Sequence, residues 1–422
     1  MGGREKLPTG GVDAYGDFPV KSGDDPLRTL AVALEELHPD SVLDLSDEPV
    51  LDYRRRHELA AIALGADVRY EGADFAFDPP PRPQLSSRPS VSIIGTGKRT
   101  GKTAVSGFAA RTLVAAGTRP VVVAMGRGGP PEPEVLRGDE IELNPRSLLE
   151  LADSGKHAAS DYIEDALLGR VPTVGCRRCG GGLAGGVEFS NVAQGVALAN
   201  EIDADLNLFE GSGSAIPPVR SDAVALIVPA GIPEEYLKGY FGPYRLLLAD
   251  LVLVTMCESP FGPPSKVSSL VSQIHDSSRR VRAGAGDQVR VIRTVFRPTP
   301  VRSVRGARAF VATTAPEAAG DSITKHLEEE HGCRVAKVSH SLSDRGKLEE
   351  ELKDIKDHAD VLLCEIKAGG VDVATRRALE HGLEVVYMDN VPMGVEGDDA
   401  EASIGWLGDL AIERFNSSGV SA

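Results

Sequence analysis

The chain has 422 residues, 46 basic and 62 acidic, so its net charge at pH 7 is −16, which argues against nucleic acid or an anionic membrane as the main partner. Five cysteines are too few for a disulfide scaffold, and there is neither a secretory signal nor a run of about 18 apolar residues, so we expect a cytoplasmic protein. The length predicts two or three domains.

The first 89 residues predict a small α/β domain followed by a linker. Residues 41–46 and 66–70 have strand-like patterns, and residues 53–65 have a helical pattern closed by glycine. The stretch 78–90 holds five prolines, so it can be neither a helix nor a central strand. We therefore expect an N-terminal domain over residues 1–89, with the linker at its end.

Apolar runs alternate with helical stretches over residues 90–302. The runs are rich in β-branched residues and end in glycine or polar residues, which is typical of strands that helices bury on both faces. This pattern predicts an α/β core with a mainly parallel, doubly wound sheet. The expected strands are 91–95, 120–126, 171–175, 206–211, 224–231, 251–260 and 289–296.

A second series of runs begins near Ala309 and predicts a smaller α/β domain over residues 303–422. Helical stretches such as 344–359 separate its strands. After Asn390 the sequence becomes acidic and then serine-rich, so we expect an acidic tail that is partly frayed. The expected strands are 310–316, 333–340, 359–366 and 383–390.

A strand, a glycine-containing loop and a helix start follow one another after the linker. Gly97 and Gly101 let backbone N–H groups turn toward phosphate oxygens, and the helix N-terminus adds its positive dipole end. In a P-loop of this kind Lys102 reaches the β- and γ-phosphates, and the Thr103 hydroxyl ligates Mg²⁺. The standard spacing places a glycine at position 96, where this chain has threonine. The expected nucleotide-binding residues are Gly95, Gly97, Lys98, Arg99, Thr100, Gly101, Lys102 and Thr103.

Glu210 lies where a buried strand is expected to end. Ligands of open parallel sheets bind at the carboxyl ends of the strands, so a carboxylate there can hold Mg²⁺ or its water. An acid next to a phosphate loop favours this interpretation over a surface turn. The expected metal ligands are therefore Thr103 and Glu210, and Arg220 on the same loop could face the substrate.

Two further loops that follow expected strands are rich in glycine and arginine. One holds Arg127, and the other holds Arg177 and Arg178. Glycines allow close approach of the backbone, and guanidinium groups suit phosphate or carboxylate. Each arginine alone could form an ordinary surface ion pair, but together they indicate a substrate with several negative charges. The expected substrate-binding residues are Arg127, Arg177, Arg178 and Arg220.

Cys176 and Cys179 form a C-x-x-C pair. A structural zinc site needs four ligands, usually with a second such pair, and the other three cysteines are scattered along the chain. Zinc binding and redox chemistry stay open, but we expect the two side chains to be small packing residues.

Glu365, Lys367 and Asp372 lie at and just after an expected strand end. This turn either contributes a charge to the active site or is an ordinary polar turn, and the polar turn is the commoner case. With the first alternative included, the expected catalytic residues are Lys98, Lys102, Glu210 and Lys367.

Five motifs follow one another along the chain: GTGKRTGKTAVSG, MGRGGPPEPE, GCRRCGGGLAGG with the following SNVAQGVALANE, EGSGSAIPPVRSDA, and GLEVVYMDN. In combination they resemble the cyclic 2,3-diphosphoglycerate synthetases, from about residue 43 to residue 390. The basic pair Lys98 and Arg99 and the acidic EGSG loop also resemble dethiobiotin synthetase, and the basic pair resembles the partitioning ATPases as well.

The resemblance implies a reaction in which ATP and 2,3-bisphosphoglycerate give a cyclic pyrophosphate, ADP and inorganic phosphate. It implies ATP and Mg²⁺ as cofactors, with Lys98 or Lys367 stabilising the leaving group. Family members carry a longer segment before the equivalent of residues 2–6, so we expect the first domain to lack its opening strand. Enzymes of this kind are commonly symmetric, and a homodimer is expected.

Two other functions fit the same P-loop. A small-molecule kinase would phosphorylate 2-phosphoglycerate and stop there, and the sequence separates it poorly from a cyclase. A switch or partitioning-type ATPase would couple hydrolysis to a protein interface, but it needs no second polyanion pocket, and the arginine loops argue against it. The choice of ATP over GTP also stays open, because no base-reading motif is evident; residues 296–300 could contribute to a base pocket.

Overall fold

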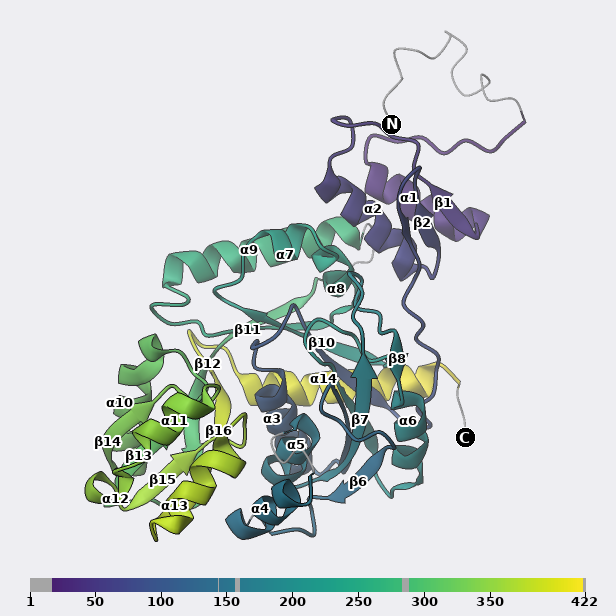
Figure 1. The fold of residues 1–422 in the computed structure, drawn as a ribbon. Coiled ribbons are helices and arrows are strands. Elements are labelled where there is room, and N and C mark those ends of the chain that lie inside the picture. The colour runs from purple at the N-terminus through teal and green to yellow at the C-terminus, as the bar shows by residue number, and fades with distance from the viewer. Residues whose placement is uncertain (1–16, 143, 156–159, 283–287, 420–422) are drawn as a thin grey trace.

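The computed structural model describes residues 17–142, 144–155, 160–282 and 288–419, so the segment 2–6 and any strand near it lie outside the described residues. The N-terminal unit projects from the rest of the molecule as a short sheet with two helices (Figure 1). Its sheet has the order β1-β2-β3, with β1 parallel and β3 antiparallel to β2, which confirms a small α/β unit. Its elements are α1 (Pro26–Leu37), β1 (Ser41–Leu43), α2 (Tyr53–Gly65), β2 (Arg69–Glu71) and β3 (Ala76–Phe77).

The described strands of the core belong to one large sheet. Its strands are β4 (Ser90–Gly95), β5 (Pro120–Gly126), β6 (Glu134–Arg137), β7 (Pro172–Cys179), β8 (Phe189–Ser190), β9 (Leu206–Glu210), β10 (Ala223–Pro229), β11 (Leu251–Thr255) and β12 (Arg290–Pro300). From β12 to β7 the order is β12-β11-β10-β4-β9-β5-β7, and all of these neighbours pair in parallel. The seven strands expected in this region and the mainly parallel sheet are confirmed.

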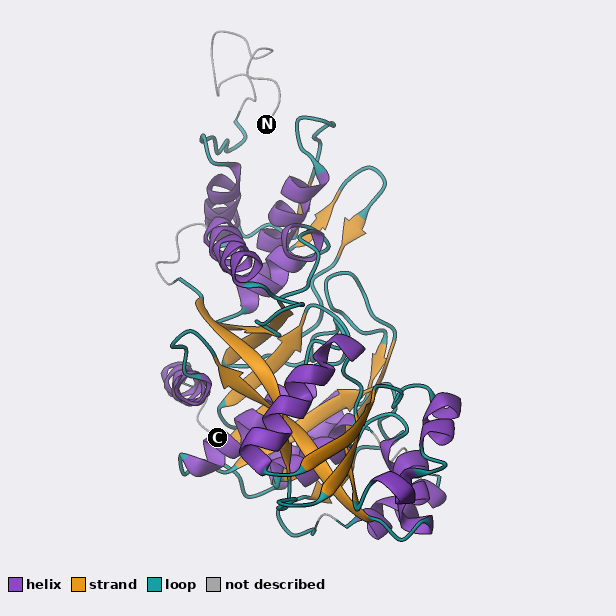
Figure 2. Ribbon diagram, turned by 90° about the vertical axis from the view of Figure 1, so that its left-hand side faces the viewer, coloured by secondary structure: helices purple, strands orange, loops and turns teal. Residues whose placement is uncertain are grey.

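Helices cover both faces of this sheet because its central strands are apolar on both faces (Figure 2). Ile93 of β4 packs in one cluster with residues of several helices, whereas its neighbour Ile94 packs on the opposite face. No helix of the described chain is long and apolar enough to cross a membrane. The core helices are α3 (Lys102–Ala115), α4 (Pro145–Asp153), α5 (Asp161–Gly169), α6 (Val192–Glu201), α7 (Glu235–Lys238), α8 (Gly242–Leu248) and α9 (Pro264–Val281).

The C-terminal block is a second parallel array with the order β14-β13-β15-β16. It contains the four strands that the sequence predicts. Its elements are β13 (Arg308–Ala312), η3 (Glu317–Ala319), α10 (Gly320–His331), β14 (Arg334–Ser339), α11 (Arg345–Glu351), α12 (Ile355–His358), β15 (Val361–Cys364), η4 (Gly370–Thr375), α13 (Arg376–Glu380) and β16 (Glu384–Gly394).

An antiparallel ribbon joins the two arrays into a 13-stranded sheet. The first part of β12 pairs with β11, and its last seven residues continue past the carboxyl end of β11 to pair with β16. In the same way β16 pairs first with β15 and then, beyond it, with β12. Since both strands extend past the carboxyl edge of their own array, the two carboxyl edges border the same space.

The prediction of a partly frayed tail after Asn390 is wrong for most of that segment. Strand β16 continues to Gly394, and α14 (Ala400–Ser417) follows, with the Asp399 side chain accepting a hydrogen bond from the Ala402 N–H at its start. Ile404 and Leu407 of α14 are buried in the same cluster as Ile93 of β4. The acidic composition had hidden an apolar stripe that packs on the core.

Candidate active site

The P-loop lies between β4 and α3 at the carboxyl edge of the core. Gly101 has a φ of +93°, and a Cβ there would lie 2.2 Å from the Phe296 ring of β12, so only glycine fits. The Lys102 ammonium donates to the Gly97 carbonyl at 2.8 Å and to the Thr100 hydroxyl at 3.3 Å. Burial lowers the pKa of Lys102 to about 8. Among the described residues, the loop thus holds a buried cation whose hydrogen-bond partners are neutral oxygens.

Acidic side chains gather next to this cation. Glu210 ends β9 in register with Ile93 of β4, and the Thr103 hydroxyl hydrogen-bonds to its carboxylate. Burial raises the pKa of Glu210 to about 7 and that of Asp165 on α5 well above its usual value. The Asp165 oxygens and the Glu210 Oε2 atom are buried and lack hydrogen-bond partners among the described residues. A proton on Asp165 would allow the two facing carboxyl groups to share a hydrogen bond.

These residues fit a magnesium ion that is completed by phosphate oxygens. Mg²⁺ is usually bound through one or two carboxylates together with substrate phosphates and water. Glu210 offers an unpartnered oxygen beside the Thr103 hydroxyl, which is such a partial site. In the described chain no group of three or more acidic, histidine or cysteine side chains is arranged to hold a metal by itself.

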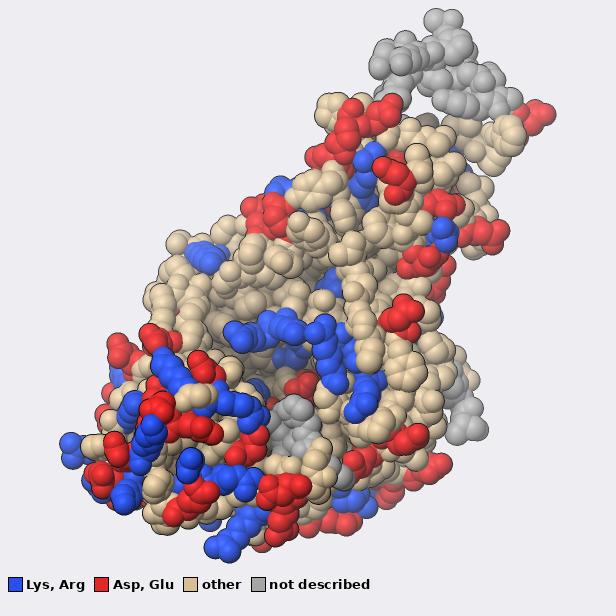
Figure 3. Space-filling model, in the orientation of Figure 1, with Lys and Arg blue, Asp and Glu red and all other residues tan. Residues whose placement is uncertain are grey.

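Basic side chains lie at the ends of β5 and β7, as the sequence predicts. Arg127 is exposed, and Arg177 is half-buried with its Nε donating to the Gly129 carbonyl at 2.6 Å. Arg178 is only 3 % exposed, close enough to Arg127 for the two charges to repel each other. Lys98 is exposed and lies near Gly213, which also adjoins the Arg178 guanidinium. Figure 3 shows basic side chains gathered in the hollow in the middle of one face.

Arg220 is not at this edge, so the expectation that it faces the substrate is corrected. Because β9 and β10 both run parallel to β4, the segment that joins them must return from the carboxyl edge to the amino edge. Arg220 lies at the end of that return, two residues before Asp222, whose N–H donates to the carbonyl of Ser90 at the start of β4. Its exposed guanidinium pairs with Asp67 at 2.8 Å.

Arg245 of α8 is a site residue that sequence reasoning missed. It is 3 % exposed and donates to the Ser214 carbonyl at 2.6 Å, next to the loop that begins at Glu210. It is also near enough to Lys102 to disfavour the charged ammonium. No motif surrounds Arg245, and a helical stretch far along the chain gives no signal of its neighbours in space.

Cys176 and Cys179 do not act together. They are three residues apart on strand β7, so their side chains leave opposite faces, and Cys176 is buried whereas Cys179 is exposed. Both thiols are free. The expectation that they are packing residues holds for Cys176, which lies in the apolar cluster under α6.

Lys367 faces the core from the C-terminal block. Its ammonium pairs with Glu164 of α5 at 3.1 Å, one residue before Asp165. Burial alone would lower the pKa of Lys367, but Glu164 and Glu365 outweigh it and raise that pKa. The two acids of this turn differ: Glu365 is buried, and Asp372 forms a partly exposed pair with Arg345. The turn therefore reaches the edge that carries the P-loop, but its lysine is already paired.

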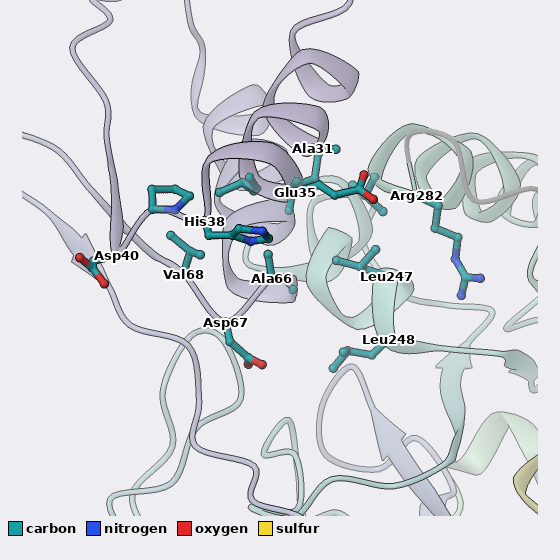
Figure 4. A pocket seen from close by; sticks show the side chains of 15 residues that line it. Ala31, Glu35, His38, Asp40, Ala66, Asp67, Val68, Leu247, Leu248 and Arg282 are labelled. Carbon is teal, nitrogen blue, oxygen red and sulfur yellow. The ribbon is translucent and has the colours of Figure 1, made fainter. Parts of the chain in front are cut away.

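A cavity of about 790 Å³ lies elsewhere, between the N-terminal unit and helices α8 and α9. Figure 4 shows Glu35, His38 and Asp67 on one side of it and Leu247 and Arg282 on the other. No residue of the P-loop or of the arginine loops lines this cavity. Its mixed lining, with a single arginine, does not match the polyanion site expected from the sequence.

A strand, a P-loop, a helix and an acid at the neighbouring strand end define a nucleotide-binding P-loop protein. Family models match the chain in three parts: the N-terminal domain of cyclic 2,3-diphosphoglycerate synthetase over residues 1–78, its P-loop domain over 90–284 and its C-terminal domain over 300–391. The chain belongs to the cyclic 2,3-diphosphoglycerate synthetase family.

Curated relatives support this assignment. A cyclic 2,3-diphosphoglycerate synthetase of Methanothermobacter thermautotrophicus is 46% identical over 425 residues, covering 99% of this chain and 90% of the relative. One of Rubrobacter xylanophilus is 49% identical over 399 residues, covering 94% and 88%. One of Thermococcus kodakarensis is 43% identical over 417 residues, covering 98% and 93%. The likeness extends over nearly the whole length of each chain.

Proposed function

We propose that this chain uses ATP to close 2,3-bisphosphoglycerate into cyclic 2,3-diphosphoglycerate, releasing ADP and inorganic phosphate. The observation that carries the proposal is a set of buried cations without carboxylate partners. Lys102, Arg178 and Arg245 donate only to neutral oxygens of the described chain. Buried charges are costly unless they are paired, so this edge is suited to a ligand with several negative charges.

The reaction itself requires such an edge. Closing a ring between two phosphates of one molecule brings like charges together, and donors placed beforehand lower the cost. In the first step one substrate phosphate accepts the γ-phosphoryl group of ATP and ADP leaves. In the second step the other substrate phosphate attacks the phosphorus of the activated group that is joined to the glycerate through its ester oxygen, closes the ring and expels the phosphate that came from ATP as inorganic phosphate. Two anhydride bonds form in turn and two break, so the atoms balance.

Each residue has a definite task in this proposal. Lys102 holds the β- and γ-phosphates, and Lys98 contacts the γ-phosphate from the exposed side of the loop. Arg127 and Arg177 bind the substrate phosphates. Lys367, from the facing edge, stabilises the leaving group once phosphate competes with Glu164 for its ammonium.

Thr103 and Glu210 would hold Mg²⁺, which supplies charge neutralisation on the phosphate oxygens. Glu210 must be ionised for this role, and the lysine beside it favours ionisation. Asp165, behind Glu210, restricts the orientations that this carboxylate can take.

Phosphorus NMR of the purified chain with Mg²⁺, ATP and 2,3-bisphosphoglycerate tests the proposal. We expect a new pair of pyrophosphate-like resonances, together with ADP and inorganic phosphate in equal amounts. In a second sample that holds 2-phosphoglycerate in place of the bisphosphoglycerate, phosphorylation without ring closure would support the kinase instead. ATP hydrolysis with both of these acceptors unchanged would contradict both reactions and favour the switch ATPase.

A further inference from the structure

Two loops lie side by side at the carboxyl edge of the core. The glycine loop comprises residues 180–186, and the acidic loop, named for Glu210 directly before it, comprises residues 211–216. The Ile216 N–H donates to the Gly185 carbonyl at 2.8 Å and joins the two loops. Within the loops, Gly182 N–H donates to Gly186 at 2.8 Å and Ala215 N–H donates to Ser212 at 3.0 Å. The loops thus form one connected surface next to Glu210.

Two arginines bridge these loops in the same manner. Arg178 donates from Nη1 to the Gly180 carbonyl at 2.6 Å and from Nη2 to the Ser212 carbonyl at 2.7 Å. Arg245 donates from Nη1 to the Leu183 carbonyl at 3.4 Å and from Nη2 to the Ser214 carbonyl at 2.6 Å. Each guanidinium therefore places one nitrogen on the glycine loop and the other on the acidic loop.

The two bridges come from different rigid elements. Arg178 belongs to β7, and Arg245 belongs to α8. Both are 3 % exposed, and the Nε atom of each is buried and has no hydrogen-bond partner in the part of the chain that the structure describes. Burial lowers the pKa of Arg245 to about 10, so the guanidinium keeps its charge at neutral pH. The loops therefore rest on two fixed positive charges.

The glycines next to the bridges leave room for them. A Cβ at Gly185 would lie 3.2 Å from Arg245 Nη2, and one at Gly213 would lie 3.2 Å from Arg178 Nη2. Both glycines have positive φ, at +87° and +62°. Larger residues there would strain the backbone and displace the guanidinium groups.

We infer that Arg178 and Arg245 are positioning residues that clamp the glycine loop to the acidic loop. The two loops, held in this way, form the surface on which the substrate phosphates bind. The identity of that anion rests on the proposed function; the clamp itself does not. Arg178 then acts through the loops it holds, and direct contact with substrate falls to the exposed Arg127 and the half-buried Arg177. A lysine cannot replace either bridge, because one ammonium lacks the planar fork that spans two carbonyls.

Hydrogen exchange of the free, full-length chain tests the clamp without any reaction. The variant is Arg245→Met, and the matched control is Arg282→Met. Arg282 also donates to neutral carbonyls of the same region, those of Leu246 and Ala249, but lies away from both loops. We expect Arg245→Met to speed exchange of the Gly182, Gly185, Ala215 and Ile216 amides at least tenfold, and Arg282→Met to leave them unchanged. Equal exchange in Arg245→Met and the wild type would overturn the clamp.

Binding measurements link the clamp to the substrate. In Arg245→Met we expect the Kd of 2,3-bisphosphoglycerate to rise at least tenfold and that of Mg·ATP to change less than threefold. Arg245→Lys, which keeps the charge and most of the volume, should fall closer to Arg245→Met than to the wild type. Wild-type affinity in Arg245→Lys, or equal losses for both ligands, would contradict the positioning role.

The two proposals fail in different ways. If the wild-type chain neither binds nor cyclises 2,3-bisphosphoglycerate, the proposed function is wrong, and the exchange experiment still decides on the clamp. If the wild type is active and the exchange rates do not change in Arg245→Met, the clamp alone is wrong. Should Arg245→Met be too unstable to purify, Arg245→Lys gives the same exchange comparison.

Discussion

The two carboxyl edges that face each other treat buried charge differently. At the core edge, Lys102, Arg178 and Arg245 have neutral hydrogen-bond partners in the described chain. At the edge of the C-terminal block the charges are satisfied by each other and by polar side chains. Glu365 accepts hydrogen bonds from the Thr313 hydroxyl, the Thr314 N–H and hydroxyl, and the Asn390 amide.

The unpaired charges of the core edge therefore serve ligand binding, whereas the paired charges of the other edge hold two parts of the protein together. Unpaired buried cations lower the stability of the free protein, and an anionic ligand recovers that loss. Paired charges need no ligand, so their first effect is to hold the C-terminal block on the core. Lys367 with Glu164 and Arg111 with Asp389 are two such connections between the block and the core helices.

The largest expected effect is on the unpaired lysine of the core edge. Lys102→Ala should abolish turnover, a loss of at least about a thousandfold, because Lys102 is the residue proposed to hold both the β- and γ-phosphates. The fold should persist, since removal of an unpaired buried charge costs little. Steady-state kinetics and circular dichroism measure the two results, and a folded variant that remains active would refute the assignment.

The paired lysine should respond in the opposite way. Lys367→Met leaves Glu164 and Glu365 buried without their cation and should lower the free energy of unfolding by about 3 kcal/mol. Glu164→Gln combined with Lys367→Met should recover part of this loss in a double-mutant cycle. Urea unfolding gives the values. If the free energy of unfolding is unchanged, Lys367 does not hold the C-terminal block on the core, and the comparison of the two edges fails.

A half-buried arginine of the core edge, Arg177, should affect substrate binding alone. Arg177→Gln removes a charge that forms no ion pair with the described residues, and it should raise the KM for 2,3-bisphosphoglycerate about tenfold. The unfolding midpoint should stay near that of the wild type. Arg137→Gln, which removes an exposed arginine paired with Asp139, is the control and should leave the KM unchanged. A similar KM for Arg177→Gln and the wild type would exclude Arg177 from the substrate site.

The pH dependence of nucleotide binding is a milder test of the same edge. The pKa of Lys102 is about 8 in the free protein, mainly because of burial, so above that pH its ammonium loses the proton that phosphate binding needs. The Kd of Mg·ATP should rise above pH 8, by up to about tenfold per pH unit. Because the folded-state pKa lies below the unfolded value, the stability contribution of this group increases from pH 8 toward 10.5. Titration calorimetry should find no such pH step in Lys102→Met.

The smallest effect belongs to an arginine outside both edges. Arg220→Ala breaks an exposed pair with Asp67 and should change the free energy of unfolding by about 0.5 kcal/mol or less. Its kcat and KM should stay within about twofold of the wild type. A tenfold rise in the KM for 2,3-bisphosphoglycerate would restore Arg220 to the substrate site and contradict its placement at the amino edge.

The fold was largely predictable because its strands are apolar runs separated by clear helical patterns. The position of Lys102 and Glu210 at neighbouring strand ends also follows from the order of strands and loops. The antiparallel ribbon between β12 and β16 was not predictable, because both strands look like ordinary buried strands and their pairing is a long-range contact.

The missed parts of the site depend on direction and packing. Arg220 shares a loop with Glu210, and only the parallel pairing of β9 and β10 shows that this loop crosses to the other edge. Arg245 and Asp165 lie on helices whose sequences carry no motif, and tertiary packing alone brings them to the P-loop. A motif identifies the residues that meet a ligand more readily than those that support them.

The ribbon of β12 and β16 has a consequence for the size of molecule that the two edges can hold between them. Seven residue pairs, from Thr294 with Gly394 to Pro300 with Met388, separate the core array from the C-terminal array. Each pair adds about 3.4 Å along the strands, so the number of pairs sets the distance between the two arrays. Removing one residue from each strand would shorten this distance and turn the side chains beyond the deletion to the other face of the sheet. The length of the two paired strands therefore fixes the width of the site, whereas a connection through a helix or loop would have left that width adjustable.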